Sequence, residues 1–147
     1  YYNLIGATFN GITFGIIFCM LACCNSGSHP GNVWPFMAGY VVTSLVCGLL
    51  SSLAGGSFTG AINAQAIVVG LCYANGLSPI VNKYGWHFGI LSAVMHYILV
   101  TSVPTLHGGY CLYNGGFTAA LICLILVPQL EKFFKTKEER QLAKAAK

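Results

Sequence analysis

The stretch LAGGSFTGAINAQAIVVGLCYANGLSPIVNK, residues 53–83, decides the fold. It places two amides, Asn63 and Gln65, after a glycine-rich approach and before a Gly-x-x-Pro sequence at 76–79. The helix expected between these breaks covers 62–75. At 1.5 Å per residue it is roughly 21 Å long, shorter than the roughly 30 Å hydrocarbon core of a bilayer. A short, interrupted helix with amides typically marks a site at the membrane midplane; a short span packed by its glycines is the alternative.

Composition sets the class of the protein. Of the 147 residues 56% are hydrophobic and 7% are charged, whereas a soluble domain carries about 25% charged residues. Lys83 is the one Lys, Arg, Asp or Glu before residue 131. Such a chain cannot cover itself with a water-compatible surface, so we predict an all-α integral membrane protein. The net charge of +4 comes mainly from the C-terminal tail, which holds six of the seven Lys and Arg residues and suits lipid headgroups and not nucleic acid.

Four further apolar segments surround the short helix, giving about five hydrophobic helices in all. We expect them at about 4–24, 33–53, 86–103 and 110–127. Trp34-Pro35 is expected in the first turn of the second segment, where proline costs little, and Pro104 and Pro128 are expected to end the last two. The predicted membrane domain is therefore 1–128, and 129–147 forms a basic amphipathic helix on the membrane surface or in solvent.

Small residues at four-residue spacing mark the helix faces that another helix can approach closely. The first segment carries Ala7, Gly11, Gly15, Cys19 and Cys23 in this pattern, and further stripes contain Gly39, Gly70 and Gly115. We select Gly11, Gly15, Gly70 and Gly115 as helix-packing positions.

Strong hydrogen-bonding side chains are scarce within the apolar segments. Those we assign to a solute pathway are Asn10, Asn63, Gln65, His96 and Asn114. All are neutral or, for histidine, able to be neutral, and a buried amide in hydrocarbon must find a partner or water. For each residue alone, the simpler interpretation is that it holds two helices together. Together with the broken helix they indicate a polar cavity for a small solute.

Catalysis and metal binding are not expected. An intramembrane hydrolase would need an activated nucleophile, such as Ser57 or Ser92 beside His96 or His107. Ser57 departs from the G-x-S-x-G pattern, and no acid orients His96. Neither the seven cysteines nor the four histidines show the spacing of a metal site, so we predict no metal and no cofactor.

The arrangement in the membrane follows from the charges. The last two apolar segments form a hairpin, so Lys83 and the basic tail lie on one side, which the positive-inside rule makes cytoplasmic. Whether 62–75 crosses the membrane or re-enters stays open. The chain begins directly in an apolar run, and about five membrane passes are few for a self-sufficient transporter, so we expect it to belong to a longer protein or to a homo-oligomer.

Several motifs together resemble one family. They are HPGNVWP (29–35), NAQAIVVGL (63–71), GLSP (76–79), YGW (84–86) and HGG…LYNGGF (107–117). This combination is similar to the C-terminal part of the bacterial multi-pass membrane proteins of domain-of-unknown-function family 1576. The resemblance covers the chain to about Lys135 and implies a membrane location. Phe9-Asn10 and Trp34-Pro35-Phe36 are similar in kind to motifs of urea transporters.

The sequence therefore predicts a cell-membrane protein whose partners are the lipid bilayer and a small polar solute. The expected function is that of a channel or transporter. The alternative is a structural or accessory membrane subunit without a permeation path.

Overall fold

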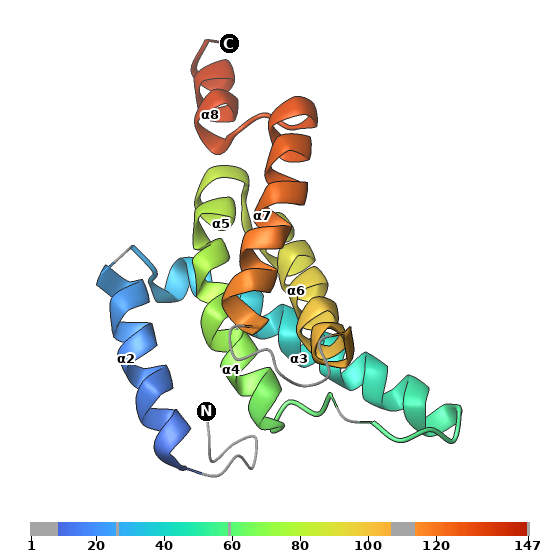
Figure 1. Ribbon diagram of the computed structural model, residues 1–147. Helices are drawn as coiled ribbons and strands as arrows, with labels where there is room; N and C mark the ends of the chain where they lie inside the picture. The colour runs from blue at the N-terminus through green and yellow to red at the C-terminus, as the bar shows by residue number, and fades with distance from the viewer. Residues whose placement is uncertain (1–8, 26, 59, 107–113, 147) are drawn as a thin grey trace.

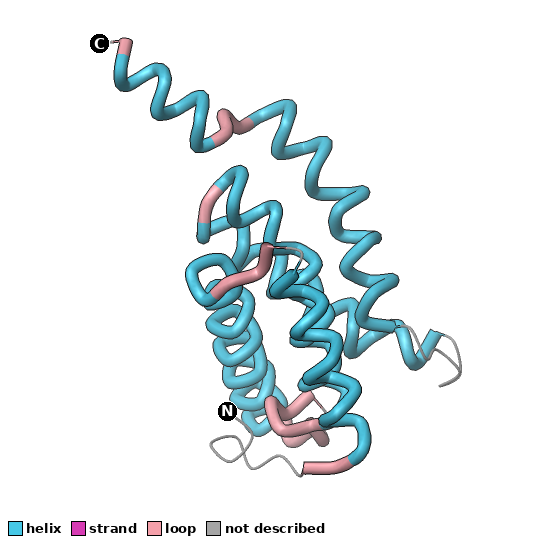
Figure 2. The backbone as a smooth tube through the Cα atoms, turned by 90° about the vertical axis from the view of Figure 1, so that its left-hand side faces the viewer, coloured by secondary structure: helices cyan, strands magenta, loops and turns pink. Residues whose placement is uncertain are grey.

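The computed structural model of the chain describes residues 9–25, 27–58, 60–106 and 114–146. These residues form helices and no strand (Figures 1 and 2), which confirms the predicted all-α fold. The elements are α2 (Gly11–Asn25), α3 (Pro30–Leu53), α4 (Gln65–Ala74), a 3₁₀ turn η1 (Asn75–Leu77), α5 (Ser78–Tyr84), α6 (Trp86–Leu106), α7 (Asn114–Phe133) and α8 (Lys137–Ala145).

Within the described residues, three helical stretches are long and apolar enough to cross a membrane. They lie at Pro30–Leu53, Trp86–Val103 and within Gly115–Ala145. Their outer faces are apolar: Leu45 on α3 is 66% exposed and Leu124 on α7 is 73% exposed. Large apolar surfaces of this kind are suited to lipid and not to water. The structure thus describes a helical membrane protein.

The core is the contact of α3, α4, α6 and α7. The α3–α6 crossing is its most extensive contact, and α4 packs on both α6 and α7. At the crossing, a Cβ atom on Gly39 would lie 2.6 Å from the Cβ of Ala93 and 3.3 Å from the carbonyl oxygen of Ile90. Real Cβ contacts are longer, so the crossing requires glycine at this position. In contrast α2, which buries only Thr13 and Ile16, contacts mainly α4 and η1.

The short central helix is broken, but it continues further than the sequence predicts. It begins at Gln65, three residues later than expected, and α5 follows it in the same general direction after the single turn of η1 (Figure 1). The three elements have 10, 3 and 7 residues, and together they span roughly 30 Å, about the thickness of the hydrocarbon core. Pro79 therefore opens α5 instead of ending the element.

Three predictions about prolines are wrong. Pro35 lies inside α3 because that helix begins at Pro30, where His29 caps it by accepting a hydrogen bond from the Gly31 N–H at 3.1 Å. Helix α6 runs past Pro104 to Leu106, and α7 runs through Pro128 to Phe133. Proline removes one helical hydrogen bond and crowds the preceding turn. Membrane helices tolerate this loss when neighbouring groups pair the freed carbonyl.

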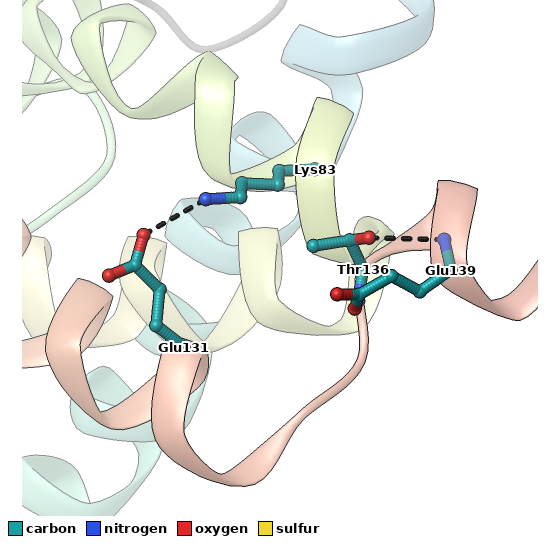
Figure 3. A network of polar contacts seen from close by, with 4 residues as sticks. All are labelled: Lys83, Glu131, Thr136 and Glu139. Carbon is teal, nitrogen blue, oxygen red and sulfur yellow. Dashed lines mark hydrogen bonds and ion pairs between the residues drawn. The ribbon is translucent and has the colours of Figure 1, made fainter.

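One end of the bundle gathers the aromatic and charged side chains. Trp34 and Trp86 pack with ring centroids 5.7 Å apart, and Lys83 pairs with Glu131 at 2.9 Å (Figure 3). The same end holds α8, whose Arg140 donates to the Tyr84 carbonyl at 3.2 Å. Lys83 and the basic tail thus lie together. The Lys83–Glu131 pair is half exposed on both sides, so water screens it and it contributes little to stability.

The start of α8 carries a pH-sensitive cap. The Thr136 hydroxyl accepts from the Glu139 N–H at 3.2 Å, and the Glu139 carboxylate accepts from the Thr136 N–H at 2.7 Å (Figure 3). This second bond holds the pKa of Glu139 below its ordinary value of 4.5. The cap therefore stabilises α8 above about pH 4.5, and that contribution is lost as the pH falls through the lowered pKa.

We expect the helical NMR shifts of α8 to decline on acidification of the wild-type protein through this range. Glutamine can make the same capping contact without titrating, so Glu139→Gln should remove the pH dependence while keeping the helix. An equal acid response in the wild type and in Glu139→Gln would contradict this assignment.

Candidate functional site

A cluster of buried polar groups joins α3, α6 and α7, and we call it the polar junction. It consists of Tyr40 on α3, His96 on α6, and Thr118 with the carbonyl of Gly115 on α7. His96 and Thr118 have no exposed surface, and Tyr40 is equally enclosed. The His96 ring makes a short hydrogen bond through Nδ1 to the Tyr40 hydroxyl. Its Nε2 lies 2.9 Å from the Gly115 oxygen and 3.0 Å from Thr118 Oγ1.

The partners of His96 define its protonation. A carbonyl can only accept, so the proton of a neutral His96 must be on Nε2, from which it is donated to Gly115. Nδ1 is then an acceptor, and the Tyr40 hydroxyl donates to it. Thr118 in turn donates to the Gly115 carbonyl at 3.0 Å. Neutral His96 therefore satisfies the polar junction without a charge.

Glycines on two neighbouring helices make room for the polar junction. On α4, a Cβ on Gly70 would lie 3.2 Å from the Tyr40 hydroxyl and 2.8 Å from a Val100 methyl. On α7, a Cβ on Gly115 would lie 2.6 Å from the ring of Tyr73. The absence of side chains at both positions lets the discontinuous helix α4 reach the polar junction and lets α7 pack on α4.

A second set of hydrogen bonds holds the chain that leads into α4. The Gly60 carbonyl accepts from Ser44 on α3 at 3.1 Å and, through a short bond, from Tyr97 on α6. Tyr97 also packs edge to face on Tyr40, with ring centroids 5.4 Å apart. The glycine-rich approach to α4 is thereby fixed to the same two helices that carry the polar junction.

The structure brings together three of the nine residues selected from the sequence, namely His96, Gly70 and Gly115. The remaining polar candidates lie elsewhere. Asn10 is exposed and caps α2, since its side-chain oxygen accepts from the Ile12 N–H at 3.0 Å. Asn63 and Gln65 are exposed, the former in a turn and the latter at the first position of α4.

Further selected positions lie at helix ends or on open faces. Asn114 is the first residue of α7, and its side chain lies outside the described part of the chain, as do Ala7 and His107. Gly11 and Gly15 lie on an exposed face of α2, where an added Cβ would meet nothing within 4 Å. Ser92, a candidate nucleophile, donates to the Phe88 and Gly89 carbonyls of its own helix.

Sequence reasoning missed Tyr40 and Thr118. Tyr40 follows Gly39 in the small-residue stripe of α3, and Thr118 lies one turn after Asn114. A hydroxyl one position from such a stripe is the signal that could have identified them, because that position also faces the partner helix.

The family comparison agrees with the motif resemblance. The profile of the family described as "Protein of unknown function (DUF1576)" matches residues 1–132. No curated protein and no solved structure matches the chain. With the match covering nearly all of the membrane helices, the chain belongs to the DUF1576 family.

Proposed function

We propose that the chain forms the membrane-embedded part of a channel or transporter for a small, uncharged polar solute. The observation that carries the proposal is the position of the polar junction. Tyr40 and His96 lie near the middle of α3 and α6, and α4, which breaks at Asn75, passes beside them at Gly70. Polar groups beside a discontinuous helix at mid-membrane depth are typical of solute sites in transport proteins.

The chemistry of the polar junction suits an uncharged solute. Its side chains offer hydroxyl and imidazole groups, which donate and accept hydrogen bonds without a full charge. The three acidic residues of the chain are Glu131, Glu138 and Glu139, all in its C-terminal part. A proton relay through carboxylates, as used by many pumps, thus has no acidic members before residue 131.

Uptake by proteoliposomes tests the proposal. We expect the wild-type protein to accelerate the entry of urea, formamide or glycerol, measured by stopped-flow light scattering. Tyr40→Phe keeps the ring but removes the hydroxyl that bonds His96, so uptake should fall about tenfold, the effect of losing one hydrogen bond of the polar junction.

Tyr84→Phe is the matched control. It removes a buried hydroxyl that has no hydrogen-bond partner within the described residues and lies at the far end of α5. Uptake should be unchanged in this variant. Equal rates for empty liposomes, the wild type and Tyr40→Phe would contradict the proposal.

A structural or accessory membrane subunit is the second candidate. The closed state of the polar junction favours it, because His96 is fully buried and both ring nitrogens are bonded. In that case Tyr40→Phe would lower the unfolding temperature while wild-type liposomes would take up no solute.

The same reasoning supports a role without catalysis. Ser92 is bonded to its own helix and His96 to Tyr40, so no hydrogen bond between the two activates the hydroxyl. We also infer that the end with Lys83 and the basic tail faces the cytoplasm of a bacterial cell membrane, as the positive-inside rule favours.

The open glycine face of α2 is a surface on which another part of the protein or a second copy would pack.

A further inference from the structure

A half-open groove runs between α2 and the wall formed by α3, α4 and η1. It consists of two adjoining hollows of about 290 and 320 Å³. Both are lined by Met20, Val33, Met37 and Asn75. The groove is on the α2 side of α4, whereas the polar junction is on its α6 and α7 side. The two sites can therefore be tested separately.

Asn75 is the distinctive feature of the groove. The residue is only 5% exposed, and it forms part of the wall of both hollows. Its side-chain amide makes no hydrogen bond within the described part of the chain, although its backbone N–H is bonded in the turn. An amide in apolar surroundings is unfavourable until it is paired. A ligand in the groove would supply the missing partner.

The walls indicate the shape of that ligand. Most side chains around Asn75 are apolar, with methionines from both α2 and α3, and neither hollow has a glycine or alanine in its lining. Membrane helices approach one another over small residues, and on α2 these are Gly11 and Gly15, which face away from the groove. Flexible methionines instead adapt to a thin and variable chain.

One end of the groove lies toward the membrane interface. Ser28, His29 and Trp34 line the hollow nearer the end of the bundle that carries Lys83. The Nδ1 atom of His29 accepts from the Gly31 N–H, so in the neutral ring the proton is on Nε2, which is available as a donor. Tryptophan is typical of the membrane interface. This end suits the headgroup of an amphiphile.

We propose that the groove binds a lipid-like amphiphile whose hydrocarbon chain lies along α2. An uncharged ester, amide or hydroxyl near the head of that chain pairs with the Asn75 amide. The headgroup lies toward His29 and Trp34, and the open side of the groove gives access from the bilayer.

Photolabelling of the full chain in alkyl maltoside micelles tests this assignment. One probe is a monoacylglycerol with a diazirine near the end of its acyl chain. The matched probe is an alkane of equal length with the same diazirine and no ester. We expect the ester probe to label α2, α3 and α4 at least fivefold more than the alkane does, with the labelled residues mapped by mass spectrometry.

Two variants distinguish a specific binding site in the groove from an unspecific apolar surface. Asn75→Leu should reduce ester labelling of the groove at least fivefold, leave alkane labelling unchanged, and keep or raise the unfolding temperature, because it replaces an amide in apolar surroundings with an apolar side chain. Asn63→Leu removes an exposed amide outside the groove and should change neither probe. If Asn75→Leu fails to fold, Met37→Trp, which fills the groove from α3, should lower labelling by both probes.

Three results would overturn the proposal. Equal labelling by the two wild-type probes, or unchanged ester labelling in Asn75→Leu or Met37→Trp, would mean that the groove is an ordinary lipid-facing surface. Cross-links from α2 of one molecule to α4 of another would mean that a second copy occupies it.

Discussion

Replacing Gly39 with valine is expected to destabilise the protein by about 3 kcal/mol, at the upper end of the range for overpacked cores. The new Cβ would lie 2.6 Å from the Cβ of Ala93 and 3.3 Å from the Ile90 carbonyl oxygen. One of these neighbours is backbone, so the strain cannot be relieved by a rotamer change, and α3 must move away from α6. Reversible unfolding in mixed micelles, followed by circular dichroism, measures the loss.

Gly15→Val is the matched control for this experiment. It makes the same substitution in an apolar helix, but at a position where an added Cβ meets nothing within 4 Å. Its effect should stay within about 0.5 kcal/mol, as for other surface substitutions. Comparable losses for the two variants would show that valine acts through helix propensity and not through the α3–α6 crossing.

His96→Leu is expected to cost about 2 to 3 kcal/mol. Leucine fills much of the same volume but removes the acceptor for Tyr40 and the donor to the Gly115 carbonyl. Interhelical hydrogen bonds in membranes are each worth about 0.6 to 1.7 kcal/mol, and His96 joins three helices. The same unfolding assay applies.

His87→Leu provides the comparison for His96. His87 lies on the same helix, is exposed, and stacks on Trp86 with ring centroids 3.6 Å apart. Little stability should be lost on replacing it. A small effect of His96→Leu, equal to that of His87→Leu, would contradict the structural importance of the polar junction.

The sequence was sufficient for the class of fold and for most helices. The near absence of charge before Glu131 excludes a soluble domain, and apolar runs of about 20 residues leave few alternatives to membrane helices. Helix ends were less predictable because they depend on tertiary contacts. Pro104 and Pro128, which would end a helix in a soluble protein, lie inside α6 and α7. Lipid offers no hydrogen bonds to the backbone of a broken helix, so each helix continues through its proline.

The polar site was predictable only in part. His96, Gly70 and Gly115 were selected separately, and nothing in their spacing showed that they would meet, since contact depends on how α4, α6 and α7 are rotated about their axes. Asn10 shows the opposite case. An amide near a helix start can form a hydrogen bond with the backbone of its own helix. A search for scarce polar residues does not detect such a local hydrogen bond.

The glycine contacts of the core also limit how this family can change in length. Each residue turns a helix by about 100°, so one inserted residue between Gly89 and Ala93 would swing Ala93 away from Gly39 while Gly89 stayed against Val81. No side-chain adjustment restores a register broken in this way. We therefore expect related proteins to vary in length in the connections between helices while keeping every helix between its crossings at constant length.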